Sequence, residues 1–349
     1  MKKLSRHELM QYGTAIISFL IVMTFTLLIF FWFVQQSVDK SVQNVLQKNT
    51  LQQKDHLELV LEKEYEFLES PAAYFGTTSD LFSNDNLQLL TELASSSSYH
   101  RLILFSTDGI GHSSDGKKTD ASSRDYFQKT LEGRRVISSP LSSSVDNETL
   151  VVLTVPVYDK DQNIIGVFGG SIDVTELTTM LFEDLYSGSG YSFITDSDGN
   201  IISIESTHNE IRENFFTSSS DWVFQTSEDG ATLQEDFKQG HANCRKITAD
   251  LSHARYISYQ PLKYNGWMLC YIIPAVDARQ PFAFINNFEI ILFAFFYLHC
   301  AASDLRTLED QPEESDFASS PGAYRCSDRA SEQSLCRTHD FRMATRKRF

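Results

Sequence analysis

Two long runs of apolar residues lie near the two ends of the part of the chain that is expected to fold. The first run, residues 13–34, has no charged side chain and is almost wholly apolar. About 20 such residues cross a bilayer as one helix, so the run predicts a transmembrane helix. Lys2, Lys3 and Arg6 precede it, and basic residues prefer the cytoplasmic side, which places residues 1–12 in the cytoplasm. No Ala-x-Ala site follows, which favours an uncleaved anchor over a signal peptide.

The second apolar run, residues 281–302, is interrupted by polar side chains. It contains Asn286, Asn287, Glu289 and His299, and its uninterrupted part is short for a membrane span. A carboxylate is costly inside lipid. We expect a second, disrupted transmembrane helix here, with an amphipathic or core helix as the alternative.

Residues 35–72 have the pattern of a long helix between the first apolar run and Pro71. Good helix formers dominate, and glycine is absent. Val38, Val42 and Val45 are spaced four and three residues apart, which is typical of the apolar stripe of an amphipathic helix. This stripe can pack on the chain's own domain or pair with a second copy in a homodimer.

One pattern of strands and turns occurs twice between the two apolar runs. A strand, an Asp-Gly turn and a return strand are expected around Asp108-Gly109 and again around Asp198-Gly199. A strand containing or ending in proline, a polar turn and an apolar strand follow at Pro156 and again at Pro261. The second of these hairpins has Asn265-Gly266 as its turn. Antiparallel strands with helices against them predict two α+β modules.

Net charge and motif content narrow the class of function. The formal net charge is -16, and no basic stripe lies within residues 35–280, so nucleic acid is not an expected partner. No nucleophile and base stand out, and the Asp196–Asn200 turn starts like a calcium loop but lacks the later glycine and glutamate. We therefore expect no enzyme activity in this chain, no metal and no cofactor.

Two of the five cysteines, Cys244 and Cys270, fall in the part between the apolar runs. They have no zinc-site spacing. A disulfide between them is one interpretation if the compartment is oxidising. Two separate thiols, with Cys270 buried in a strand, are the other.

Four segments share a pattern with a known family. They are SRDYF at 123–127, TVPVYD at 154–159, IGVFGGSID at 165–173 and YSFITDSDG at 191–199. These segments resemble the double Cache domain, the PAS-like extracellular sensor domain of bacterial receptors. The resemblance covers about residues 36–280. It implies a membrane-distal module over 73–185 and a membrane-proximal module over 186–280, each with a central antiparallel sheet.

The resemblance also implies a small-molecule pocket in the distal module. By position, Arg124 and Tyr126 would lie on its helix or loop and Asp173 on the facing strand, with Tyr158 and Ser139 as further candidates. An arginine can hold a carboxylate with two hydrogen bonds, and an aspartate can hold an amine. The bland alternatives are surface pairs for Arg124, core packing for Tyr126, and a helix cap for Asp173.

The residues around Arg124 depart from the pattern of amino-acid-binding relatives. Those relatives carry a tyrosine five residues before the arginine and a Trp-Tyr pair just after it. The corresponding residues here are Thr119, Tyr126 and Phe127. The ligand class is therefore open among amino acids, organic acids and amines.

These patterns together predict a membrane-anchored sensor in the cell membrane, with residues 35–280 extracellular or periplasmic and a small solute and membrane lipid as its partners. The alternatives are a tethered binding or adhesion protein without signalling and an extracellular hydrolase. Residues 303–349 are polar and lack the signature of an output domain such as a diguanylate cyclase. We expect a disordered tail here, from a truncated or frameshifted receptor.

Overall fold

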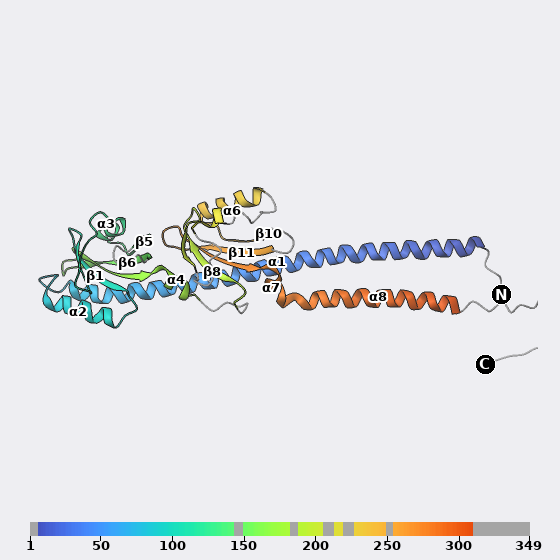
Figure 1. The fold of residues 1–349 in the computed structure, drawn as a ribbon, viewed down its shortest axis with the longest axis horizontal. Coiled ribbons are helices and arrows are strands. Elements are labelled where there is room, and N and C mark those ends of the chain that lie inside the picture. Colours follow the sequence, from blue (N-terminus) through green and yellow to red (C-terminus); the bar gives the residue numbers. More distant parts are fainter. Residues whose placement is uncertain are drawn as a thin grey trace, which may run out of the picture. The chain divides into compact units, whose positions relative to one another are not determined.

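The computed structural model describes residues 6–142, 149–181, 188–204, 213–218, 227–248 and 254–309. One long helix comes first, and two separate antiparallel sheets follow it in the chain (Figure 1). This is the α+β architecture that the sequence predicted. We keep the names distal module for the first sheet with its helices and proximal module for the second.

The first helix, α1 (Arg6–Phe75), is 70 residues long and joins the predicted membrane span to the predicted stalk without a break. At 1.5 Å per residue it is about 105 Å long. The sequence prediction ended this helix near 72, but α1 continues through Pro71 to Phe75. A proline removes one helical hydrogen bond, and the burial of Leu68, Ala72 and Phe75 in the distal core offsets that loss.

The described residues of the distal module form seven strands and three short helices. The strands are β1 (Arg101–Ser106), β2 (Ile110–Ser113), β3 (Lys118–Asp120), β4 (Val136–Ile137), β5 (Leu141–Ser142), β6 (Thr149–Tyr158) and β7 (Ile164–Asp173). The helices are α2 (Asn84–Ser95), α3 (Asp125–Leu131) and α4 (Val174–Thr179). The sheet has the order β3-β2-β1-β7-β6-β4, and β5 pairs with β6. The sequence analysis missed α2 and the short strands β3, β4 and β5.

The proximal module repeats this topology with five strands among its described residues. They are β8 (Tyr191–Thr195), β9 (Ile201–Ile204), β10 (Asn243–Thr248), β11 (Ala254–Pro261) and β12 (Met268–Pro274), in the order β10-β11-β12-β8-β9. In both modules the first strand pairs with the last, and the repeated Asp-Gly turn joins the first strand to the second. Gly109 and Gly199 have φ angles of 92° and 84°, a left-handed conformation that glycine adopts without strain.

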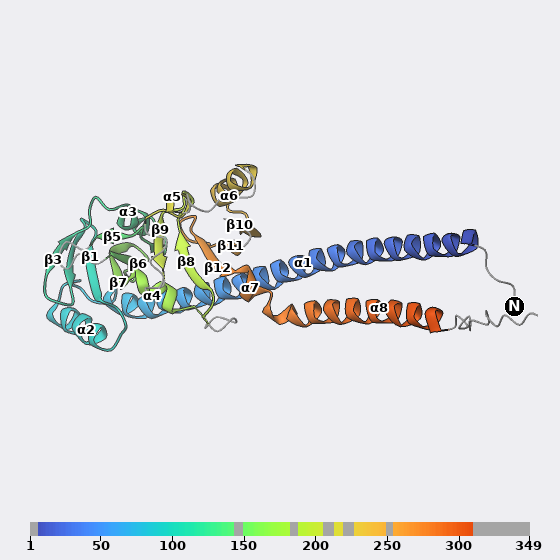
Figure 2. The ribbon, with the colours of Figure 1, turned by 45° about the vertical axis from the view of Figure 1, so that its right-hand side comes forward.

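Each sheet is covered on both faces by helices (Figures 1 and 2). In the proximal module α5 (Phe215–Ser218) and α6 (Ser227–Gln239) cover one face, and α1 covers the other. In the distal module α1 and α2 pack on one face and α3 on the other. The same helix α1 thus supplies part of both cores.

The glycine pair Gly169-Gly170 lies inside β7 and does not interrupt it. β7 pairs with β1 and β6 through this point without a register shift. A Cβ atom on Gly170 would lie 2.2 Å from the Tyr99 ring, so glycine is needed there to let the ring pack on the strand.

The buried face of α1 differs in detail from the predicted stripe. Val38 and Val42 are buried in the proximal core, as the spacing suggested, but the third member is Leu46. Val45 is 43% exposed. Spacings of four and four track the face of this helix that meets the sheet, and so the stripe packs on the chain's own domain.

After β12 the chain passes through α7 (Ala275–Ala278) and the 3-10 helix Gln280–Phe282 into α8 (Ala283–Glu309). Two of the described helices, α1 and the one over Gln280–Cys300, are long and apolar enough to cross a membrane. Residues 303–309, predicted to belong to a disordered tail, are helical, and their leucine, arginine and glutamate residues favour helix. The rest of that predicted tail, from 310 onward, lies outside the described residues.

Because α1 packs on the distal sheet, shortening the Leu61 side chain should strongly lower the stability of the protein. Leu61 is 1% exposed in the distal core, whereas Leu59 on the same helix is 53% exposed. Leu61→Ala should lower the free energy of unfolding by about 2–5 kcal/mol. Leu59→Ala should change it by less than about 0.5 kcal/mol. Urea denaturation of the detergent-solubilised chain, followed by tryptophan fluorescence, to which the buried Trp267 contributes, measures both changes, and equal losses would contradict this packing.

Candidate functional site

A cavity of about 480 Å³ lies in the distal module beside the first turn of α3. Its walls come from α3, from the segment that includes β4 and the first residue of β5, and from one residue of the proximal module. The lining residues are Ser123, Arg124, Asp125, Tyr126, Lys129, Val136, Ile137, Ser138, Ser139, Leu141 and Asn265. Three of the predicted site residues, Arg124, Tyr126 and Ser139, are therefore brought together.

Arg124 occupies the N-cap position of α3. Arg124 has the extended backbone of a cap residue, but its side chain makes no capping bond. The two acids nearest to it in the sequence have other partners. Asp125 forms an ion pair with Lys129 at 2.7 Å, and Asp120 accepts a hydrogen bond from the Ser122 backbone N–H at 2.8 Å. Within the part of the chain that the structure describes, the Arg124 guanidinium has no carboxylate partner.

Tyr126 forms the apolar side of the same wall. It is 9% exposed and packs in a cluster with Phe105, Phe127 and Val152. Burial raises the pKa of its phenol, and the nearby positive charge of Arg124 opposes that rise. A cation and a largely buried aromatic ring thus lie side by side at the cavity, which suits a ligand with one anionic and one apolar end.

The facing wall is fixed by hydrogen bonds of the backbone around Ser138. The Ser138 hydroxyl accepts a bond from the Val152 N–H at 2.9 Å and donates to the Ser139 carbonyl at 2.8 Å. The Ser139 side chain is exposed and reaches the cavity. This wall therefore has a fixed position relative to the central strand β6.

The other two predicted site residues lie elsewhere. Tyr158 lines a different cavity, of about 330 Å³, between the end of α1 and the β6–β7 turn. Asp173 is the N-cap of α4, where its Oδ1 accepts bonds from the Thr175 N–H at 2.7 Å and hydroxyl at 2.6 Å. It does not belong to the lining of either cavity, and the helix-cap interpretation describes its position.

Sequence reasoning missed Lys129 and Asn265 as cavity residues. Lys129 lies one helical turn after Asp125, and that spacing could have indicated both the pair and its place beside Arg124. Asn265 was identified only as half of a hairpin turn in the other module. No local signal shows that this turn reaches the distal cavity.

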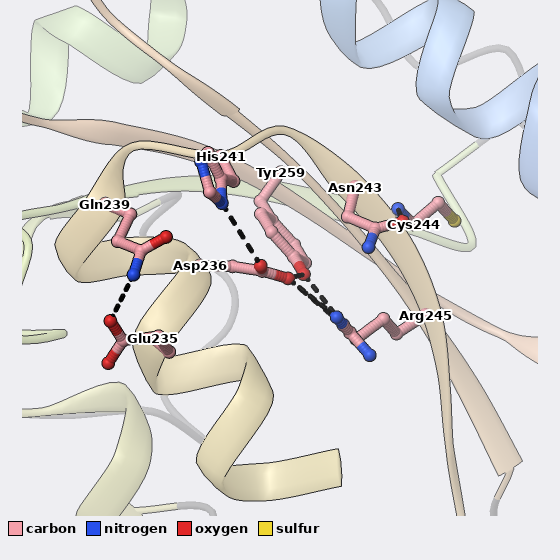
Figure 3. A network of polar contacts seen from close by, with 8 residues as sticks. All are labelled: Glu235, Asp236, Gln239, His241, Asn243, Cys244, Arg245 and Tyr259. Carbon is pink, nitrogen blue, oxygen red and sulfur yellow. Dashed lines mark hydrogen bonds and ion pairs between the residues drawn. The ribbon is translucent and has the colours of Figure 1, made fainter.

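The proximal module has a dense polar network between α6 and its sheet (Figure 3). Asp236 on α6 accepts hydrogen bonds from the Tyr259 hydroxyl at 2.5 Å and from Arg245 at 2.8 Å. His241 Nδ1 lies 3.7 Å from the other carboxylate oxygen. Figure 3 shows Asp236 directed at these groups, whereas Glu235 turns away to Gln239.

The network stabilises the charged form of Asp236. Partial burial alone would raise the pKa of this carboxyl, but the hydrogen bonds from Tyr259 and Arg245 outweigh burial and lower it. Burial is the main cause of the raised pKa of Tyr259. The bonds of Asp236 to Tyr259 and Arg245 hold α6 on the sheet.

Cys244 and Cys270 are both buried free thiols. Cys244 faces α1 in one core cluster, and Cys270 faces α5 and α6 in another, on the opposite side of the proximal sheet. Of the two interpretations of these cysteines, the structure has the two separate thiols, because the intervening sheet separates the two sulfur atoms. Burial raises the pKa of the Cys244 thiol to about 12.

Comparison with known families gives one match over most of the chain. The family model described as Cache domain matches residues 32–282. This range begins near the end of the predicted first membrane span. It ends at the last residue before α8, so it includes both modules.

Comparison with solved structures finds the same fold in ligand-binding domains of bacterial chemoreceptors. That of Campylobacter jejuni Tlp3 in complex with L-valine is 15% identical, covers 71% of this chain and 98% of its own, and has a TM-score of 0.53. That of Pseudomonas aeruginosa PctB with L-Arg is 14% identical (69% and 98% covered, TM-score 0.52). That of Pseudomonas fluorescens CtaA with L-isoleucine is 16% identical (70% and 97% covered, TM-score 0.52). At sequence identities this low, the comparison shows a shared fold alone.

The lowered pKa of Asp236 predicts how its contribution to stability depends on pH. Asp236→Asn removes the charged acceptor of Tyr259 and Arg245, so we expect a loss of about 1.5–3 kcal/mol at pH 7. The wild-type contribution is complete above the unfolded-state pKa of about 3.9 and is lost as the pH falls through the lower folded-state pKa. The difference between wild type and variant should therefore shrink below about pH 4.

Urea denaturation of both proteins from about pH 3 to pH 7 checks this expectation. Glu235→Gln is the matched control, because its side chain is exposed and bonds only Gln239 in Figure 3. The control should follow wild type throughout. A gap for Asp236→Asn that stays constant down to about pH 3 would contradict the assignment.

Proposed function

This chain belongs to the Cache domain family, and we propose that it is a membrane-anchored sensor that binds a small solute in the distal cavity beside Arg124. Cache domains are sensor domains of membrane receptors, and the N-terminal part of α1 is apolar enough to anchor such a receptor. Three basic residues before the span favour an orientation with both modules outside the cytoplasm.

One observation carries the proposal. The Arg124 guanidinium lines a cavity of about 480 Å³ and has no carboxylate partner among the described residues. A cation without an acidic partner, next to a buried aromatic ring, is ready to accept an anionic group of a ligand. The cavity volume suits a molecule the size of an amino acid or a short organic acid.

The charges around the cavity favour a carboxylate ligand over an amine. The only acid among the described lining residues, Asp125, is already paired with Lys129. Asp173, which the resemblance placed at a ligand amine, caps α4. Related domains bind L-valine, L-arginine and L-isoleucine, so amino acids remain the natural comparison for this chain.

The route from the modules to the membrane passes through Asp39 on α1. Its carboxylate accepts a hydrogen bond from the Tyr256 hydroxyl at 2.5 Å, lies 3.5 Å from the Lys246 ammonium and pairs with Arg279. These three partners come from β10, β11 and the segment that leads into α8. A shift of the proximal sheet would therefore reach both membrane helices, which suits transmembrane signalling.

We expect substitution of Arg124 to weaken the binding of solutes. The test is a thermal-shift screen of the full chain in detergent against L-amino acids, short carboxylates and amines. It includes L-valine and 3-methylbutanoate, which differ only in the ammonium group. A bound solute raises the melting temperature by mass action. Arg124→Ala should weaken binding about 10-fold to 100-fold, which corresponds to the loss of about 1.5–3 kcal/mol from charged hydrogen bonds.

The matched control is Arg134→Ala. Arg134 is exposed, pairs with Glu132 at 2.6 Å and does not line the cavity, so solute affinity should stay unchanged. If Arg124→Ala and the wild type bound a solute with equal affinity, the ligand would lie elsewhere. A response to amines alone would contradict the carboxylate preference.

A further inference from the structure

The tip of the β11–β12 hairpin, residues 263–266, belongs to the proximal module but reaches the distal cavity. Asn265 and Gly266 have φ angles of 50° and 67°, the left-handed pair of a tight two-residue turn. Asn265 is the one lining residue of the described cavity that comes from the proximal module. The turn therefore places a side-chain amide of one module in the wall of the other module's cavity.

The Asn265 side chain is bonded to the wall itself. Its Nδ2 donates a hydrogen bond to the Ile137 carbonyl at 2.8 Å. Ile137 is the last residue of β4, and Ser138 and Ser139 continue the wall directly after it. Any displacement of this wall by a ligand therefore changes the position of the acceptor of Asn265.

A second contact joins the same two segments through α1. The Lys263 N–H donates to Glu58 at 2.9 Å, and its ammonium lies 3.7 Å from Glu62. Glu62 also pairs with Arg135, the residue just before β4. The two ends of this contact are thus the hairpin tip and the start of the cavity wall.

We propose that the β11–β12 tip is part of the distal solute site and that Asn265 reports the state of the cavity to the proximal module. The proposal rests on the proposed function of that cavity and adds a residue and a direction of coupling to it. β12 runs from the tip to Pro274, where α7 begins, so a movement of Asn265 is passed along a central strand toward the membrane. The contacts of Asn265 and Lys263 hold the tip on one side, and the pairing of β11 with β12 holds it on the other. The tip therefore has a defined position, and a ligand in the cavity can shift it.

The experiment uses a tethered occupant, so that it does not depend on an identified solute. Ser139→Cys places a thiol in the exposed part of the wall. Ethyl methanethiosulfonate then attaches an ethylthio group there, with methanesulfinate leaving. Hydrogen exchange of the full chain in nanodiscs is followed in peptides covering residues 258–269. The unsubstituted protein, treated in the same way, controls for labelling of its native cysteines.

We expect the tethered group to change the exchange rates of the tip amides at least threefold when Asn265 is present. The change should disappear in Asn265→Gly, because glycine keeps the left-handed turn and removes the amide. Gln162→Gly is the matched control. Gln162 has a φ angle of 65° in the β6–β7 turn and does not line this cavity, so the change should persist there.

The proposal is overturned if the exchange rates of the tip change equally with and without the Asn265 amide. It is also overturned if they do not change in the fully labelled Ser139→Cys protein. Asn265→Asp repeats the comparison with a side chain of the same size, and should also lose the change because its carboxylate cannot donate to Ile137. The two proposals fail separately. If the tethered group changes hydrogen exchange at the tip but no solute raises the melting temperature, the proposed ligand class is wrong. If a solute raises the melting temperature but the tethered group changes nothing at the tip, the proposed role of Asn265 is wrong.

Discussion

Both modules depend on one continuous interaction, the burial of a single face of α1. The face passes through Val42 and Leu46 in the proximal core and through Leu57, Leu61 and Leu68 in the distal core. Its period follows the helical repeat, so one rod can supply the missing side of two sheets. Neither sheet presents its α1-side face to solvent, and the relation of each module to the helix is fixed by packing.

The two modules share a strand order but use the outer face of the sheet differently. In the proximal module that space is filled by Phe215, Leu233 and Phe237, with Asp236 bonded to Arg245 above them. In the distal module α3 is short, and its first turn and the segment around Ser138 border a cavity. The same topology therefore gives one module whose outer face is packed and hydrogen-bonded, and one module with a cavity for a solute.

The sequence predicted features that depend on local chemistry. The anchor, the Asp-Gly turns and the main hairpins follow from apolar runs, left-handed glycines and strand alternation, and Arg124, Tyr126 and Ser139 do lie together. Other features depend on distant partners. The continuation of α1 through Pro71 depends on the distal core. The continuity of β7 at Gly170 depends on the Tyr99 ring, and the cavity position of Asn265 depends on how one module meets the other.

The sequence also left the role of Asp173 open between ligand contact and helix cap. The difference depends on which backbone N–H groups lie nearby, and the start of α4 provides them. Val45 illustrates the same limit. A valine at the right spacing was assigned to the buried stripe, but the side chain that meets the sheet is Leu46.

The position of α1 before both sheets in the chain has a consequence for folding. Val42 precedes every strand of the proximal module, yet Ile273, in the same core cluster, lies on β12, the last strand of that module. The contacts that close the proximal core therefore span most of the polypeptide, and such long-range contacts form slowly. Until β12 has been synthesised, the apolar stripe of α1 has nothing to cover it and is open to aggregation. Folding of the proximal module should thus be limited by the completion of β12.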